Sequence, residues 1–168
     1  MIEQAIMGTI RTLEVTHVAT AKIVYASMTG NNEEIAQIME EQFENLGVEV
    51  DTTEASQADA SDFEDVDICV VATYTDGEGE IPDEAQDFYD DLQEEDLTGK
   101  IYGTCGSGDR FYGDHFCATV DDFDHTFAQT GATKGAESVK IDLAAEAEDI
   151  ENLDAFVKEL VAKANANG

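Results

Sequence analysis

The sequence predicts an α/β fold: a doubly wound, five-stranded parallel sheet with helices on both faces. Two observations predict it. Five short apolar or alternating runs recur along the chain, and stretches with the apolar spacing of amphipathic helices separate them. Such alternation builds βαβ units, whose right-handed crossovers make the strands parallel. A chain of 168 residues, 42% of them hydrophobic, has room for one such domain with a real core.

The first half of the predicted sheet begins with residues 23–26, a short apolar run that ends in a glycine-containing loop. Apolar residues at helical spacing follow over 35–46, and Gly47 ends that helix. Residues 48–52 alternate as a second strand. The most apolar run, 67–72, predicts a central strand because a strand in mid-sheet is covered on both faces.

The second half repeats the pattern. Residues 83–92 have a helical spacing of apolar side chains, and 101–105 form a fourth strand. A third helix presents its apolar face over 116–127. An uninterrupted fifth strand is expected at 136–143, followed by a last helix over 150–161.

Residues 1–21 do not fit this alternation. We expect them to form a disordered N-terminal extension, and the folded domain to occupy residues 22–165. The extension lacks the basic start and apolar stretch of a signal peptide, and no run approaches the about 20 apolar residues of a membrane span. Cys69, Cys105 and Cys117 form no CxxC pair, which indicates reduced thiols and a cytoplasmic location.

The charge is strongly negative. Eight Lys and Arg residues stand against 39 Asp and Glu residues, for a formal net charge of −31. Proteins that bind nucleic acid carry basic patches, so this balance argues against a nucleic-acid partner. It also argues against docking on an anionic membrane.

In a doubly wound sheet, ligands bind beyond the carboxyl ends of the strands, which draws attention to three loops. The loop after the first strand opens directly into a helix, where free N–H groups and the helix dipole favour an anion. It has no GxxxxGK[ST] and no lysine, so it is not a nucleoside-triphosphate loop. An ordinary capped turn remains the alternative. The candidate residues here are Ser27, Met28, Thr29, Gly30, Asn31 and Asn32.

The other two loops combine glycines with aromatic and acidic residues. Glycines allow the backbone to approach a flat ligand closely, and an aromatic ring in a surface turn suggests stacking on such a ligand. Phe111 is expected to pack under its loop, and His115 to face solvent. The alternative for the first of these loops is a flexible acidic surface loop. The candidates are Thr73, Tyr74, Thr75, Asp76, Gly77 and Gly79 after the third strand, and Ser107, Gly108, Asp109 and Tyr112 after the fourth.

Taken together, these loops resemble those of the short-chain flavodoxins. The resemblance rests on SMTGNNEE after AKIVYA, on VVATYTDGEGEIPDE, and on GKIYGTCGSGDRFYGDHFC, and it covers residues 22–163. It implies the flavodoxin-like strand order 2-1-3-4-5 and a non-covalently bound FMN. It also implies the function of a low-potential one-electron carrier rather than an enzyme with its own substrate.

The resemblance also implies a role for each loop. The loop at 27–32 would hold the FMN phosphate, the loop at 73–79 would cover the inner face of the flavin, and the loop at 107–112 the outer face. Tyr112 would be the stacking ring, and the Gly77 carbonyl could turn toward the flavin N5–H. Two departures are expected to weaken FMN binding modestly. Asn32 stands where the family usually has a hydroxyl, and Asp76 where it commonly has an aromatic ring.

A carrier of this kind is expected to be a monomer and to use its acidic surface to meet redox partner proteins with basic patches. Two other functions stay open on the sequence. One is an FMN-dependent NAD(P)H:quinone-type oxidoreductase, and the other is a flavin-free interaction module of the same fold. A signalling receiver is disfavoured because the first strand ends in Ala26-Ser27 rather than in acidic residues.

Overall fold

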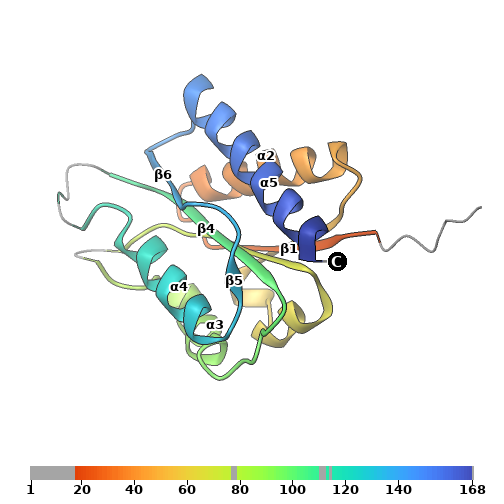
Figure 1. The fold of residues 1–168 in the computed structure, drawn as a ribbon. Coiled ribbons are helices and arrows are strands. Elements are labelled where there is room, and N and C mark those ends of the chain that lie inside the picture. Colours follow the sequence, from red (N-terminus) through yellow and green to blue (C-terminus); the bar gives the residue numbers. More distant parts are fainter. Residues whose placement is uncertain (1–17, 77–78, 110–112, 114, 168) are drawn as a thin grey trace, which may run out of the picture.

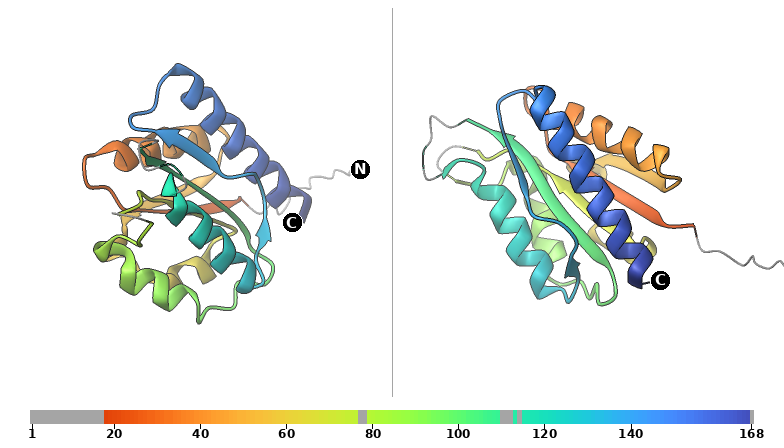
Figure 2. Two further views of the ribbon diagram at one scale, coloured as in Figure 1. Left: turned by 90° about the vertical axis from the view of Figure 1, so that its left-hand side faces the viewer. Right: turned by 45° about the horizontal axis from the view of Figure 1, so that its top comes forward.

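The computed structural model describes residues 18–76, 79–109, 113 and 115–167. A twisted parallel sheet forms the middle layer, with helices α2 and α5 on one face and α3 and α4 on the other (Figures 1 and 2). The strand order is β2-β1-β3-β4-β5, and β6 also pairs with β4. This confirms the predicted doubly wound α/β fold and the order implied by the flavodoxin resemblance.

All the strand pairs are parallel. The strands are β1 (Thr20–Tyr25), β2 (Glu49–Glu54), β3 (Ile68–Ala72), β4 (Ile101–Gly108), β5 (Thr133–Lys134) and β6 (Val139–Asp142). The helices are α2 (Asn31–Asn45), α3 (Asp83–Leu92), α4 (Ala118–Gln129) and α5 (Ala147–Asn167), with two short 3₁₀ segments, η2 (Ala55–Gln57) and η3 (Ala60–Asp65). Each described α-helix follows a strand of this parallel sheet, so α2, α3, α4 and α5 begin near the carboxyl ends of the strands.

The first strand starts earlier than the sequence predicted. Thr20 and Ala21, which were assigned to the N-terminal extension, are the first two residues of β1. The Thr20 N–H and hydroxyl both donate to Asp67 Oδ2, at 3.0 and 3.2 Å, and these bonds fix the start of the strand. The rest of the predicted extension, up to residue 17, lies outside the described residues.

The fifth strand is not continuous: residues 139–142 of the predicted 136–143 run form β6, whereas β5 lies ahead of that run. Two short strands, β5 and β6, share the edge of β4 in its place (Figure 1). Gly135 still pairs with Tyr102 through its N–H, at 2.9 Å, but a Cβ on Gly135 would lie 2.4 Å from Ile101. The chain then leaves the ladder, and the Ser138 hydroxyl bonds to that of Thr104 at 2.8 Å before β6 begins.

Two apolar cores cover the two faces of the sheet, and they differ in chemistry. The core under α2 and α5 is mostly aliphatic. The core under α3 and α4 is built around aromatic rings, among which Tyr102 stacks on Phe127 with the ring centroids 4.8 Å apart. Because these side chains fix every helix against the sheet, they also fix the ends from which the loops project.

Candidate functional site

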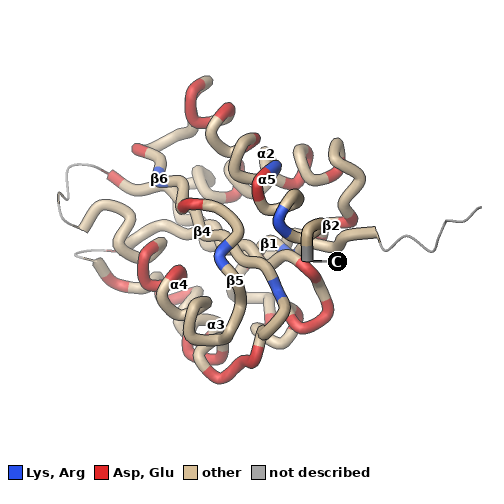
Figure 3. The backbone as a smooth tube through the Cα atoms, in the orientation of Figure 1, with Lys and Arg blue, Asp and Glu red and all other residues tan. Residues whose placement is uncertain are grey.

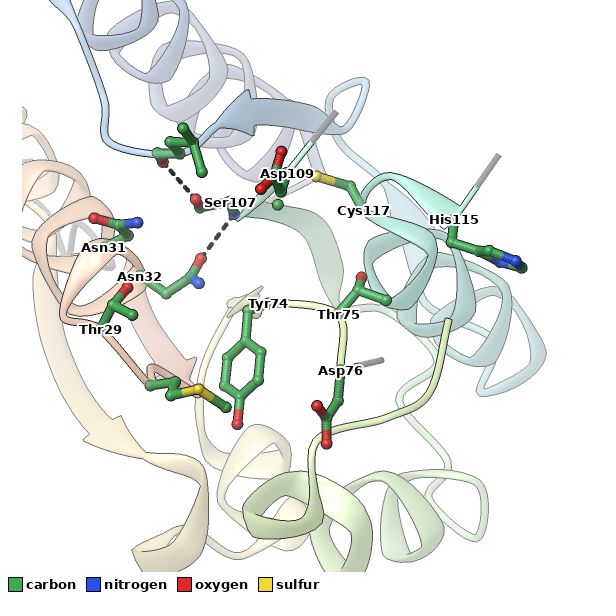
Figure 4. Close-up of a pocket in the computed structure, with 13 residues that line it drawn as sticks. Thr29, Asn31, Asn32, Tyr74, Thr75, Asp76, Ser107, Asp109, His115 and Cys117 are labelled. Carbon is green, nitrogen blue, oxygen red and sulfur yellow. Dashed lines mark hydrogen bonds between the residues drawn. The ribbon is translucent and has the colours of Figure 1, made fainter. Parts of the chain in front are cut away.

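A cleft of about 250 Å³ opens at the carboxyl edge of the sheet, between the loops that follow β1, β3 and β4 (Figure 4). Ten of the sixteen residues predicted from the sequence line it, so the three loops do converge. Three further residues complete the lining. The predicted ones are Met28, Thr29, Asn31, Asn32, Tyr74, Thr75, Asp76, Ser107, Gly108 and Asp109, and the others are His115, Cys117 and Leu143.

The loop after β1 is shaped by two predicted residues that do not line the cleft. The Gly30 N–H donates to Ser27 Oγ at 3.0 Å, and Gly30 adopts a φ of 93° at the N-cap of α2. That left-handed conformation favours glycine. The N-cap residue makes no side-chain hydrogen bond to this helix. The N–H groups of its first turn can therefore donate to a bound anion.

Asn32 joins the first loop to the third. Its side chain is buried, and its Oδ1 accepts a hydrogen bond from the Ser107 N–H at 2.9 Å. This bond fixes the orientation of the amide, so Nδ2 is directed away from Ser107 and toward the cleft (Figure 4). The Ser107 hydroxyl in turn donates to the Leu143 carbonyl. An amide at position 32 therefore supplies both a tether between loops and a donor.

The loop after β3 supplies one wall of the cleft. Thr73 is buried away from it, since its N–H continues the sheet by donating to the Cys105 carbonyl at 3.1 Å. The ring of Tyr74 stands in the wall, and its hydroxyl donates to Glu84 at 2.7 Å (Figure 4). Burial, then the hydrogen bond to Glu84, raises the pKa of Tyr74 above its usual value. Tyr74 thus stays a neutral ring in the wall of the cleft, which Asp76 also lines.

Asp76 and Glu80 close the same loop. Their backbones form an antiparallel bridge, with N–H to carbonyl distances of 2.9 and 2.8 Å. Gly79 does not line the cleft but packs beneath His115 with a φ of 105°. Gly77 lies outside the described residues, so the role implied for its carbonyl stays a prediction.

The loop after β4 supplies the opposite wall through Gly108 and Asp109. Tyr112, the predicted stacking ring, and Phe111 both lie outside the described residues, and their roles stay predictions. His115 is exposed, as expected, but it also lines the cleft.

Sequence reasoning gave no site role to Cys117 or Leu143. Within the described part of the chain, they are the only non-glycine residues with positive φ, at 55° and 62°. Both line the cleft. Strained backbone of this kind gathers at functional sites, where the surrounding structure holds it in place. Neither residue type signals a left-handed conformation, so the sequence carried no sign of it.

The electrostatics of the lining are simple. Asp76 and Asp109 contribute carboxylates, and no Lys or Arg is among the described lining residues.

No cluster of ligating side chains able to hold a metal ion occurs in the described ranges. None of the helices there is both long and apolar enough to cross a bilayer.

The cleft suits a mononucleotide that carries a flat ring. Hydroxyls, amides and the free N–H groups of α2 gather at one end, where a phosphate would be bound. Tyr74, Gly108 and Asp109 line the rest of the cleft. A Cβ on Gly108 would lie 3.0 Å from Cys117 Sγ, so glycine lets the start of α4 pack against this loop.

Comparisons with known proteins agree with this geometry. The Flavodoxin family profile matches residues 23–155. The chain is 37% identical to "Probable flavodoxin 1" of Bacillus subtilis over 148 residues, which are 88% of this chain and 93% of that protein.

Solved structures give the same answer. A short-chain flavodoxin associated with a bacterial microcompartment superposes with a TM-score of 0.86 at 56% identity, over 88% of this chain and 99% of that one. The flavodoxin of Streptococcus pneumoniae TIGR4 superposes with a TM-score of 0.84 at 59% identity, over 86% and 99%. The chain belongs to the flavodoxin family, whose members are electron-transfer proteins that carry FMN.

Proposed function

We propose that this protein is a low-potential one-electron carrier that holds FMN in the cleft and shuttles electrons between reductases and acceptor proteins. The observation that carries the proposal is the convergence of the three loops on one cleft, with anion donors at one end and the ring of Tyr74 in the wall. FMN supplies the redox chemistry when it is bound, and the chain's residues bind it and set its potential.

The phosphate would be held by the N-terminal turn of α2. Thr29, Asn31 and Asn32 line that end of the cleft, and the first-turn N–H groups add donors that no side chain caps. The charge of −31 does not forbid this, because exposed charges are screened beyond about 8 Å at physiological salt. Hydrogen bonds to the phosphate act at about 2.9 Å and are not screened in that way.

The flavin ring would lie between Tyr74 and the loop that contains Gly108, Asp109 and Tyr112. Tyr74 lines the cleft and can supply the aromatic contact that Asp76 does not. An aromatic contact contributes about 0.5–1.5 kcal/mol beyond the area it buries. Asp76 therefore weakens FMN binding by about tenfold or less, and it does not abolish it.

Carboxylates around the ring would lower the potential of the bound flavin. A unit charge at about 10 Å in an effective dielectric of about 20 disfavours a negative charge by about 1.7 kcal/mol, or about 70 mV for one electron. Asp76 and Asp109 line the cleft, and no described Lys or Arg there offsets them. Adding the second electron, which makes the flavin anionic near neutral pH, should therefore become markedly harder.

A redox titration of bound and free FMN tests this proposal. We expect two well-separated one-electron potentials in the protein, with the second more negative than that of free FMN. Overlapping potentials would contradict the one-electron mechanism.

We also propose that the partners meet the protein at the cleft edge through basic patches. The α-helices of the described ranges, α2 to α5, carry acidic residues in their first turn and no basic residue in their last turn. Because the helices begin at the cleft edge, their carboxylates surround it, and red segments mark these helix ends in Figure 3. Among these residues Asp121 pairs with Lys140 at 2.8 Å, and the others are Glu33, Glu34, Asp83, Glu84, Glu148 and Asp149.

The partner proposal is tested by the rate of electron transfer to a basic c-type cytochrome at several salt concentrations. Glu34→Gln combined with Glu148→Gln removes two exposed charges at the cleft edge. Glu49→Gln combined with Glu94→Gln removes two exposed charges at the opposite end of the sheet. We expect the first pair to slow the reaction at low salt more than the second. Equal effects, or rates that ignore salt, would contradict a docking face at the cleft.

We further propose that the carrier is a cytoplasmic monomer. Cys69, Cys105 and Cys117 are buried and joined by no disulfide, which suits a reducing compartment. Burial raises the pKa of the Cys69 and Cys105 thiols, which keeps both protonated and unreactive. Sedimentation of the FMN-loaded protein across a range of concentrations tests the monomeric state, and a mass that rises with concentration would contradict it.

A further inference from the structure

The side chain that caps helix α4 does not come from the residue at its N-cap but from the loop after β3. Its N-cap residue, Cys117, makes no side-chain cap bond. The N–H of Thr119, in the first turn, instead donates to Thr75 Oγ1 at 3.0 Å. A hydroxyl normally caps the helix that it directly precedes. Thr75 precedes Thr119 by 44 residues and belongs to the loop after β3, so the bond joins two walls of the cleft.

The side chain of Thr119 makes a second bond to the same loop. Its hydroxyl donates to the Glu80 carbonyl at 3.2 Å. That carbonyl also accepts the Asp76 N–H at 2.9 Å, so Thr119 is bonded to the bridge that closes the loop. Thr119 is 0% exposed, and its hydroxyl has no water to replace a lost partner. Leaving a buried group unsatisfied costs more than a typical hydrogen bond contributes.

A steric contact reinforces the two hydrogen bonds. His115, which comes four residues before Thr119, places Nδ1 3.0 Å from where a Cβ on Gly79 would lie. Position 79 can thus carry no larger side chain unless the imidazole moves. The start of α4 and the residues that lead into it therefore contact the loop after β3 at Thr75, Gly79 and Glu80.

We propose that Thr119 is a positioning residue that sets the spacing of the two cleft walls and so the fit of the flavin ring. Thr119 does not line the cleft itself; it acts through Thr75, whose side chain does. This proposal rests on the proposed FMN function. Without the hydroxyl of Thr119, the loop after β3 would lose one of its two bonds to α4, and its wall would shift against the ring.

The test compares three variants of the full-length protein, loaded with FMN. Thr119→Val keeps the shape and the backbone cap but removes the hydroxyl, and Thr119→Ser restores a hydroxyl. Thr126→Val changes a threonine that is equally buried on the same helix but lies two turns away from the loop. The measurements are the FMN dissociation constant, the visible circular dichroism of bound FMN, and unfolding by guanidinium.

We expect Thr119→Val to weaken FMN binding by about three- to tenfold and to change the visible circular dichroism of the flavin. Thr119→Ser should restore both, and Thr126→Val should change neither. If Thr119→Val lowers stability as Thr126→Val does and leaves the affinity and the dichroism unchanged, Thr119 is merely structural and the proposal is wrong. If Thr119→Val does not fold, Thr119→Ala, which also lacks the hydroxyl, takes its place: altered dichroism and weaker affinity support the proposal, and values identical to wild type overturn it. A wild-type protein that fails to bind FMN would instead overturn the proposed function.

Discussion

The interior of the sheet and its carboxyl edge follow different rules. The interior is mostly apolar, although Lys22 and Thr104 are buried on its strands, and the backbone of those strands stays in ordinary conformations. The cleft edge gathers buried polar side chains, Asn32, Thr73, Ser107 and Thr119, and both of the positive-φ non-glycine residues that occur in the described ranges. The comparison teaches that the core specifies where the loops begin, while polar contacts between loops specify the cleft.

The largest expected change in the free energy of unfolding comes from placing a side chain on a glycine of β4, and it should differ between Gly106 and Gly103. A Cβ on Gly106, near the cleft, would lie 1.9 Å from the Thr73 carbonyl oxygen, which is backbone and cannot move aside. A Cβ on Gly103, in the core, would lie 2.6 Å from the end of the Phe156 ring, which can shift. We expect Gly106→Ala to lower the free energy of unfolding by about 3–5 kcal/mol, and Gly103→Ala by about 1–3 kcal/mol. Guanidinium unfolding measures both, and equal losses would remove the distinction.

Two hydrogen bonds made by β4, one near its carboxyl end and one in its middle, give the next comparison. Asn32→Ala leaves the Ser107 N–H without its acceptor, and Thr104→Val leaves the Ser138 hydroxyl without its partner in the sheet. Each should cost about 1–3 kcal/mol of unfolding free energy. Only Asn32→Ala should also weaken FMN binding, because only Asn32 lines the cleft. A titration that finds the two variants equal in FMN affinity would show that the tether does not shape the site.

The opposite end of the molecule holds a carboxyl pair whose effect depends on pH. The Oε1 atom of Glu95 is buried from solvent. A hydrogen bond with the Glu64 carboxyl, then burial and the charges of Glu64 and Asp91, raises the pKa of Glu95 to about 7. The folded chain thus holds this proton more tightly than the unfolded chain does, so the stabilisation is full below about pH 4.5 and is lost as pH rises through about 7.

Glu95→Gln should flatten this dependence. Between pH 5 and pH 8 the free energy of unfolding of the wild type should fall by about 1–2 kcal/mol more than that of the variant. The expected difference is this small because Glu64 is exposed, and solvent screens its interaction with Glu95. Glu94→Gln, at the exposed neighbouring position, is the control and should keep the wild-type slope. Parallel stability curves for all three proteins would contradict a shared proton.

The smallest effect tests backbone strain at the cleft. Leu143 has a φ of 62°, and its side chain is exposed although its N–H and carbonyl are both bonded to the end of β4. A left-handed conformation costs about 1–2 kcal/mol for a residue with a Cβ. Glycine relieves this cost but also gives the unfolded chain more conformational freedom, which opposes folding. The net effect of Leu143→Gly should be a stabilisation of about 0.5–1 kcal/mol. Leu143→Ala keeps the Cβ and should not stabilise it, so a thermal melt in which the two variants match would argue against strain.

Most of the architecture could be predicted because it follows from apolar periodicity. The runs at 67–72 and 101–105 became β3 and the first part of β4, and the flavodoxin resemblance added the strand order. The bounds of the fifth strand, at the edge of the sheet, were not predicted correctly. The break between β5 and β6 depends on the close approach of Gly135 to Ile101, which apolar periodicity does not encode. The start of β1 was missed because polar Thr20 joins the sheet through Asp67, a partner distant in sequence.

The cleft was predictable in outline and less so in detail. Motifs at the strand ends identified ten residues that line it. They did not reveal that Ser27 and Thr73 make structural bonds instead, or that His115, Cys117 and Leu143 line the cleft. These facts depend on contacts between loops that are far apart in the sequence, such as the bond from Ser107 to Leu143.

Calorimetric titration of the apoprotein with FMN and with riboflavin tests the central claim most directly, since riboflavin keeps the ring but lacks the phosphate. If the α2 turn and its neighbouring hydroxyls and amides bind the phosphate while the other two loops bind the ring, one FMN should bind per chain, and riboflavin should bind at least about 100-fold more weakly. Equal affinities for the two ligands, or no heat with FMN at micromolar concentrations, would contradict the account.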